Sequence, residues 1–265
     1  MKRVSAGDTD FCLTSVHHYL TARAQEGELA CRFVAVVVQQ SPLAAIVASD
    51  SRFRQPADLA GARVAAPADN GQFLEFLAAL AYLGVDAPLV VRMDGEQARV
   101  ALGTGEVDAV VSLVDGMPRV RRQAGVPVRP IPVALDVYAS GLVAGEHVPA
   151  ATAWQMRASV AAALEAQREQ PETGLPELRR RYPEALEGEA LEGWRLLAPN
   201  IFTGAEPGSM SASRWHDTIS LLSDARGLPR LLPESVYRPQ FADVSAPQSE
   251  MRAGRRPAEK EELFS

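Results

Sequence analysis

The stretch RVAAPADNGQFLEFLAALAYLG, residues 63–84, reads as a strand, a loop and a helix in succession. Residues 63–66 form a short apolar run typical of a buried strand, and the Pro- and Gly-containing residues 67–71 interrupt it. Large apolar side chains recur at three- and four-residue spacing in residues 73–83, which is the period of an amphipathic helix, and Gly84 is the residue type that commonly ends one. This order predicts one half of a βαβ unit.

The same alternation continues on both sides of this stretch. Further strands are predicted at residues 34–38, 43–48, 89–93 and 107–113, with a short helix at residues 96–102. Alternating strands and helices predict a parallel sheet with helices on both faces, and ligands of such sheets bind at the carboxyl ends of the strands. The fold class predicted here is therefore α/β.

The pattern changes after residue 150, where helices are predicted one after another. Their ranges are 153–167, 176–182, 185–197 and 213–225. Residues 243–265 are polar and charged with few large apolar side chains, so a disordered tail is predicted there.

Composition excludes several classes of protein. The chain has 265 residues, 47% of them hydrophobic, with a formal net charge of −6 and a pI of about 5.4. An acidic chain lacks the basic surface of a nucleic-acid-binding protein. No apolar run is long enough to span a membrane. Cys12 and Cys31 are too few for a zinc site without histidines at ligand spacing, and they are expected to be partly buried thiols, although a disulfide between them is open.

Four pieces of the sequence carry a resemblance to a known family. They are GDTDF at residues 7–11, PADLAGARVA at 56–65, ALGTGEVDA at 101–109, and the segment 215–237. In this order they resemble the type 2 periplasmic solute-binding proteins, in the branch that binds nitrate, sulfonates, taurine and thiamine precursors.

The resemblance implies a two-lobed fold, in which each lobe is a mostly parallel sheet flanked by helices. Residues 1–52 and 138–242 would form lobe one, and residues 53–137 would form lobe two. The chain would cross between the lobes near residues 48–51 and return near 138–144. A small polar or anionic organic solute would bind in the cleft between the lobes.

The chain departs from the family at its start. Family members begin with a secretion signal, a strand, a helix and a second strand, and residues 1–8 carry neither this pattern nor the apolar run of a signal peptide. Lobe one is thus expected to lack its first elements, and the chain as written is expected to be cytoplasmic, or periplasmic or extracellular if the true start lies upstream. An unpaired strand edge left in lobe one could pair two copies into a homodimer.

The loop at residues 67–72 is the strongest candidate for ligand binding. It joins a strand end to a helix N-terminus, where free backbone N–H groups and the helix dipole favour an anion. In the resembled family this turn contacts the carboxylate, sulfonate or nitrate of the solute. Asn70, Gly71 and Gln72 are predicted to do so here, although a capped turn without a ligand would have the same sequence pattern.

Five further residues are candidates at the other edges of the cleft. Thr14, Ser15 and His17 follow the strand at residues 7–11 and could donate hydrogen bonds to a ligand. Alternatively, Thr14 or Ser15 could cap a helix and His17 could be a surface histidine. Asp115 follows the strand at 107–113, where it could contact the ligand or form a plain turn. Tyr138 lies at the predicted return crossing and could line the cleft or pack between the lobes.

Two enzyme classes resemble the same branch. An aromatic sulfinate desulfinase would need an activated cysteine, for which Cys12 with His17 is a weak candidate. A thiamine-pyrimidine synthase would need a cysteine-rich segment, which two cysteines cannot form. The sequence therefore favours solute binding without a cofactor, as the binding component of an ABC-type uptake system with a permease as partner, over catalysis.

Overall fold

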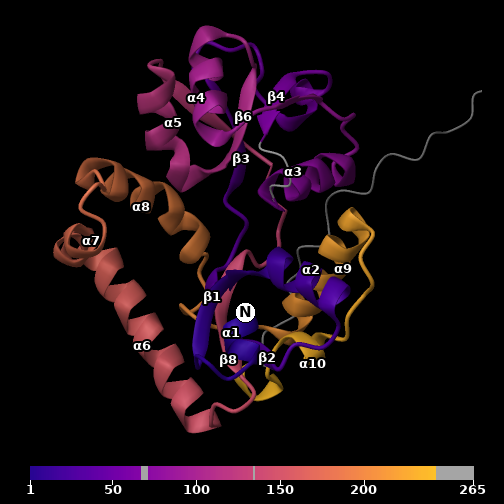
Figure 1. Cartoon of the computed structure of the whole chain (residues 1–265), viewed down its shortest axis with the longest axis vertical. Coiled ribbons are helices and arrows are strands. Elements are labelled where there is room, and N and C mark those ends of the chain that lie inside the picture. Colours follow the sequence, from indigo (N-terminus) through magenta and orange to yellow (C-terminus); the bar gives the residue numbers. More distant parts are fainter. Residues whose placement is uncertain (67–70, 134, 243–265) are drawn as a thin grey trace, which may run out of the picture.

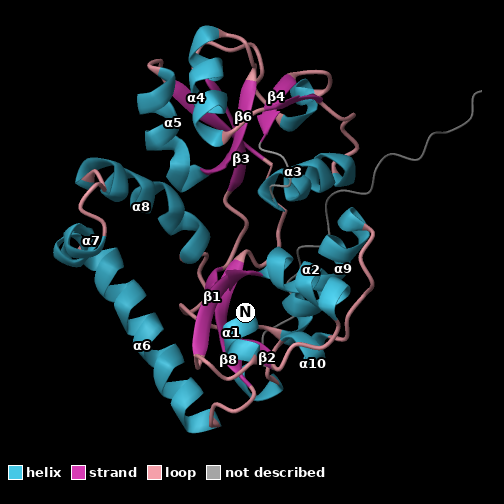
Figure 2. Ribbon diagram, in the orientation of Figure 1, coloured by secondary structure: helices cyan, strands magenta, loops and turns pink. Residues whose placement is uncertain are grey.

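The computed structural model describes residues 1–66, 71–133 and 135–242, and it contains two sheets in two separate parts of the molecule (Figures 1 and 2). The first sheet has the strand order β1-β8-β2, and the second has the order β5-β4-β6-β3-β7. The strands are β1 (Phe11–Ser15), β2 (Cys31–Val38), β3 (Leu43–Ala48), β4 (Arg63–Ala66), β5 (Leu89–Arg92), β6 (Ala109–Leu113), β7 (Val128–Pro132) and β8 (Ser140–Gly145).

Helices cover both sheets. The α-helices are α1 (Lys2–Ser5), α2 (Val16–Glu26), α3 (Gly71–Tyr82), α4 (Gly95–Thr104), α5 (Met117–Ala124), α6 (Ala150–Glu169), α7 (Leu175–Arg181), α8 (Glu187–Ile201), α9 (Ala212–Arg226) and α10 (Pro233–Val236). Short 3-10 helices are η1 (Pro56–Leu59), η2 (Val114–Gly116), η3 (Pro171–Gly174) and η4 (Pro239–Phe241). No helix among the described residues is long and apolar enough to cross a bilayer.

Strand direction shows how the chain links the two sheets. In the second sheet β5, β4 and β6 are parallel, and β3 is antiparallel to both of its neighbours, β6 and β7. In the first sheet β8 is antiparallel to β1 and to β2. Each sheet thus contains one reversed strand, which is the strand that arrives from the other sheet. The α/β two-lobed fold is confirmed, but every pairing in the three-stranded sheet is antiparallel because β8 separates its two parallel strands.

The passage between sheets occurs earlier than the sequence suggested. Because β3 pairs with β6 and β7, the chain leaves the first sheet between Val38 and Leu43 and not near residues 48–51. The predicted start of lobe two at residue 53 would assign β3 to the wrong sheet. Otherwise the division into residues 1–52 with 138–242, and 53–137, remains a prediction, and the predicted tail at 243–265 lies outside the described residues.

Two family-like pieces of sequence have a clear structural role. The Asp58 carboxylate accepts hydrogen bonds from the backbone N–H groups of Arg54 and Gln55 at 2.7 and 3.1 Å, which closes the turn that leads into β4. The Asp108 carboxylate lies 2.8 Å from Arg63 Nη2 and accepts the Arg63 backbone N–H at 2.8 Å, which joins the starts of β4 and β6. Gly105 ends α4 in the left-handed conformation.

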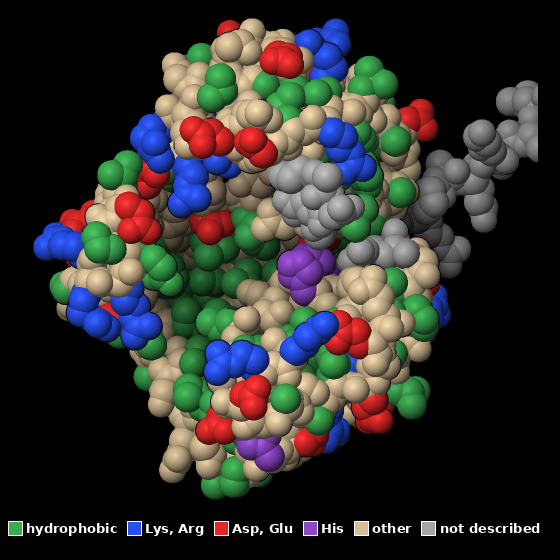
Figure 3. Space-filling model, in the orientation of Figure 1, with side chains coloured by type: hydrophobic (Ala, Val, Ile, Leu, Met, Phe, Trp, Pro, Cys, Tyr) green, Lys and Arg blue, Asp and Glu red, His purple; other side chains and the backbone are tan. Residues whose placement is uncertain are grey.

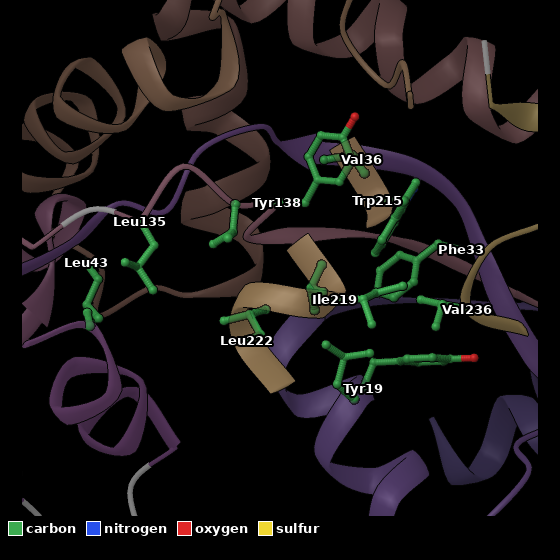
Figure 4. Packing of buried hydrophobic residues seen from close by; sticks show 14 of the residues in the cluster. Tyr19, Phe33, Val36, Leu43, Leu135, Tyr138, Trp215, Ile219, Leu222 and Val236 are labelled. Atoms are coloured by element: carbon green, nitrogen blue, oxygen red, sulfur yellow. The ribbon is translucent and has the colours of Figure 1, made fainter. Parts of the chain in front are cut away.

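The main hydrophobic core is built around aromatic side chains. Trp215 of α9 is fully buried, and its ring lies between those of Phe33 at 5.0 Å, Tyr138 at 5.1 Å and Tyr237 at 5.7 Å (Figure 4). These rings come from β2, the segment before β8, α9 and the residue after α10. Residues distant in sequence are thereby fixed around the first sheet, and a smaller apolar cluster fills the space between α4, α5 and the second sheet.

We expect Gly103→Ala to destabilise the protein by about 1–3 kcal/mol, because an added methyl group would collide with the Ala124 carbonyl oxygen where α4 meets α5. Gly188→Ala in α8 is the matched control, since a methyl there meets no atom within 4 Å and should stabilise by up to about 1 kcal/mol. Urea unfolding measures both. Equal effects of the two substitutions would contradict the close approach of α4 to α5.

Asp108→Asn should lower the free energy of unfolding by roughly 1 kcal/mol at pH 7. Hydrogen bonds from the Arg63 side chain hold the pKa of Asp108 below its usual value. The stabilisation is therefore complete above the unfolded-state pKa of about 3.9 and is lost as the pH falls through the lower folded-state pKa. Urea unfolding at several pH values should show the difference between wild type and variant shrinking only below about pH 4. The exposed Asp86, changed to Asn, is the control.

Candidate functional site

Helices α2 and α3 come from opposite parts of the molecule, and both begin at the gap between the two sheets (Figure 1). Strand β1 ends at Ser15 and α2 begins at the next residue, so the strand delivers the helix N-terminus to this gap. Ser15 caps α2: its Oγ accepts the His18 backbone N–H at 3.4 Å and lies 2.8 Å from His18 Nδ1. The predicted capping role of Ser15 is thus present, and Thr14 is the preceding, partly buried strand residue.

The candidate loop leads directly into α3. This helix begins at Gly71, and Gln72 is its second residue and is partly buried. Asn70 lies outside the described residues. The twelve residues of α3 and the eleven of α2 are each long enough to present a partial positive charge at their N-termini.

A buried polar contact joins the two helices. His17 Nδ1 of α2 lies 2.9 Å from Glu75 Oε2 of α3, and the Ser41 hydroxyl donates a hydrogen bond to Glu75 Oε1 at 3.1 Å. All three residues are buried, with exposed fractions of 5%, 8% and 2% for the whole residues His17, Glu75 and Ser41. His17, considered from the sequence as a donor to a ligand, therefore makes a buried interhelical polar contact with Glu75.

A hollow of about 750 Å³ lies on the other side of the gap, between η2 and α5 above and α7 and α8 below. Figure 3 shows the molecule hollowed between its two parts, with hydrophobic side chains gathered in the hollow. Its lining includes Asp115, Arg119, Tyr182, Leu186, Trp194 and Leu197. Asp115 is solvent-accessible at the wall of this hollow, and the surrounding protein raises the pKa of its carboxyl by desolvation.

Tyr138 packs in the core. It is 2% exposed, its hydroxyl accepts the Ser211 backbone N–H at 2.9 Å, and its own N–H donates to Thr218 Oγ1 at 3.2 Å. The Arg214 guanidinium lies over its ring at 4.8 Å. The sequence left open whether Tyr138 lines the cleft or packs between the lobes, and in the structure it is packed in the core.

The thiols do not form a catalytic pair with a histidine in the described part of the chain. Both cysteines are free, and burial raises the pKa of Cys31 to about 11, which keeps it a neutral thiol. His17 turns its Nδ1 to Glu75, so the Cys12–His17 pair considered from the sequence is not formed. The described residues also hold no cluster of three or more His, Cys, Asp or Glu suited to a metal ion.

Glu75 and Ser41 were missed from the sequence. Glu75 is the one acidic residue in a strongly apolar helix, and that isolation was an available signal of a buried partner. Ser41 gave no signal, because its neighbour in space is 34 positions away in the chain.

Solved structures identify the fold. The periplasmic aliphatic sulphonate binding protein SsuA from Escherichia coli superposes with a TM-score of 0.65 at 18% identity, covering 100% of this chain and 85% of that one. The alkanesulfonate-binding protein SsuA from Xanthomonas axonopodis pv. citri, bound to MOPS, gives 0.61 at 18% identity, covering 91% and 82%. The ligand-binding component of an ABC-type import system from Staphylococcus aureus gives 0.60 at 10% identity, covering 91% and 82%. The fold is that of a two-lobed periplasmic binding protein.

The family follows from sequence. The family described as NMT1/THI5 like matches residues 1–169, more than half of the chain, and the protein belongs to it. This confirms the resemblance to type 2 solute-binding proteins of the nitrate/sulfonate/taurine branch. No curated protein matches the chain by sequence.

Tyr138→Phe should lower the free energy of unfolding by about 0.5–1.5 kcal/mol, because the partly buried Ser211 N–H loses its acceptor. Ligand affinity should change less than twofold, since the ring packing is kept. Chemical denaturation and calorimetric titration measure the two effects. A tenfold loss of affinity with unchanged stability would instead place the hydroxyl at the ligand.

Proposed function

We propose that this protein binds a small organic anion in the gap between its two lobes, as the substrate-binding component of an ABC-type uptake system. The observation that carries the proposal is the meeting of two helix N-termini, one from each lobe, at the same gap. Each N-terminus carries a partial positive charge that favours an anionic group. In α2 the N–H groups of Val16 and His18 are already bonded, to the Ala139 carbonyl oxygen and to Ser15 Oγ, so the attraction there comes mainly from the helix dipole.

The anion would lie against the first turns of α2 and α3. Gly71 and Gln72 are the proposed contacts on α3, with Asn70 before them, and Thr14 and Ser15 are the proposed contacts at the end of β1. His17 and Tyr138 are engaged elsewhere in this structure, so we assign them no direct contact. Closure of the lobes around the solute would be a hinge motion about the crossing segments.

The hollow beside the gap suits the rest of the solute. Its lining combines apolar and aromatic side chains, such as Trp194 and Leu197, with the charged Asp115 and Arg119. An organic anion has an apolar part that such a wall can cover. The names of the similar structures agree with this class, since two of them are sulfonate-binding proteins, one with MOPS bound.

Catalysis is not part of the proposal. The similar structures are named as binding proteins, and the two thiols of this chain have the environment of inert cysteines or lack a histidine partner in the described region. We also propose that the protein works outside the cytoplasm with a permease, as the periplasmic relatives are named. Nothing in the similar structures supports the cytoplasmic location or the homodimer considered from the sequence.

A thermal-shift screen tests the function. The probes are nitrate, taurine, alkyl and aryl sulfonates, aromatic carboxylates and pyrimidines. A solute that binds only the folded protein stabilises it by about 2.7 kcal/mol at a hundredfold excess over its Kd. We expect an upward shift with at least one anionic probe and none with the uncharged pyrimidines.

Gln72→Ala should weaken binding of that probe by tenfold or more in calorimetric titration. Gln155→Ala is the matched control, because Gln155 is an exposed glutamine on α6, far from both helix N-termini. A cooperative melt that no anion shifts would refute the proposal.

A further inference from the structure

The contact between His17 and Glu75 is unusual in its burial. Their side chains are 6% and 11% exposed, whereas the pairs that join α5 to α8 are open to solvent: Arg121–Glu192 has exposures of 46% and 34%. Exposed ion pairs contribute about 0–1 kcal/mol, but removing one partner of a buried pair leaves the other group desolvated without compensation. The buried contact therefore constrains the two lobes more strongly than the exposed ones.

The third residue in this contact, Ser41, links it to the backbone that connects the two sheets. Ser41 lies in the segment between β2 and β3, where the chain passes from one sheet to the other, and it donates to the same carboxylate. The end of α8 holds this segment as well, because the Asn200 carbonyl accepts the backbone N–H groups of Gln39 and Gln40 at 2.8 and 3.0 Å. Glu75 thus connects one helix of each lobe to the crossing segment about which the lobes would turn.

The contact also lies close to the proposed site. His17 is the second residue of α2, and Glu75 is the fifth residue of α3, so the carboxylate and imidazole hold the first turns of both helices side by side. Neither group is required to touch the ligand for this effect. A change in their separation would move one helix N-terminus relative to the other.

We propose that His17, Ser41 and Glu75 form a latch between the lobes that positions the N-termini of α2 and α3 for ligand binding. The inference rests on the proposed function for its ligand but not for its geometry. Glu75 and His17 are positioning residues: they act through the helices and not on the solute. The latch predicts that the free protein already favours the arrangement seen here, and that ligand affinity depends on it.

The geometry can be tested without any ligand. Spin labels at Glu106→Cys and Leu232→Cys, both exposed and on opposite lobes, report the distance between the lobes in a background where Cys12 and Cys31 are Ala. The wild-type background should give one narrow distance distribution. Glu75→Ala should broaden it or add a longer population, and an unchanged distribution would overturn the latch.

Two further variants separate positioning from general instability. Glu75→Gln keeps one oxygen that can accept from Ser41, and its amide N–H can donate to His17 Nδ1 in the tautomer that carries the proton on Nε2, so it should restore a narrow distribution. Glu192→Ala removes an exposed partner from the other side of the gap and should leave the distribution unchanged. A thermal melt monitored by circular dichroism confirms that each variant is folded. Equal broadening by Glu75→Ala and Glu192→Ala would contradict a specific role for the latch.

The consequence for binding is measured with a probe such as ethanesulfonate or nitrate. Glu75→Ala and His17→Ala should each weaken it at least tenfold, and the double variant should be no weaker than the single ones, because both remove one contact. Additive losses would overturn the coupling. If the wild type binds no probe, the proposed function fails, and the distance measurement alone still decides the latch.

Discussion

Strand β8 is the element on which the first sheet depends, because it lies between β1 and β2 and pairs with both; apart from it, β2 has only two isolated bridges among the described residues, to Tyr237 and Gly208. This strand follows the last strand of the second sheet, so the three-stranded sheet joins segments that lie before and after the second sheet in the chain. A methyl group on Gly141, the second residue of β8, would collide with the Ala35 carbonyl oxygen of β2, which accounts for glycine at that position. Each sheet thus contains one strand that the chain enters directly from the other sheet: β3 in the second sheet and β8 in the first. The backbone itself therefore links the two lobes twice.

This coupling explains where the candidate site lies. A chain that crosses between two sheets leaves a gap at the crossing, and the helices that follow the adjoining strands begin there. Helix α2 follows β1, and α3 follows β4 after the loop at residues 67–70. Both helices therefore begin at one place. In the proposed site the partial positive charges of the two N-termini would attract the solute, which suits solutes that are recognised by their negative charge.

The buried cluster of His17, Ser41 and Glu75 affects the arrangement of the chain more than its stability. Burying a carboxylate and an imidazole in an apolar region contributes little net stability, and replacing such pairs by apolar residues is often neutral. Their effect is on arrangement: Glu75 can satisfy its oxygens only when α2, α3 and the crossing segment are together. In the proposed latch, the same polar group would contribute little to stability and would still set the relative position of α2 and α3.

Local pattern in the sequence determined most elements: the apolar periodicity of residues 73–83 and the glycine endings predicted α3 and α4, and the β-branched runs predicted β2 and β3, because these depend on near neighbours. The motifs also predicted the solute-binding fold. Tertiary structure alone decided that β3 joins the second sheet, that Tyr138 packs against Trp215, and that His17 pairs with Glu75, 58 positions away. These outcomes depend on which distant segments meet, and a side chain that can bind a ligand, cap a helix or pair with a buried acid has the same local sequence in each case.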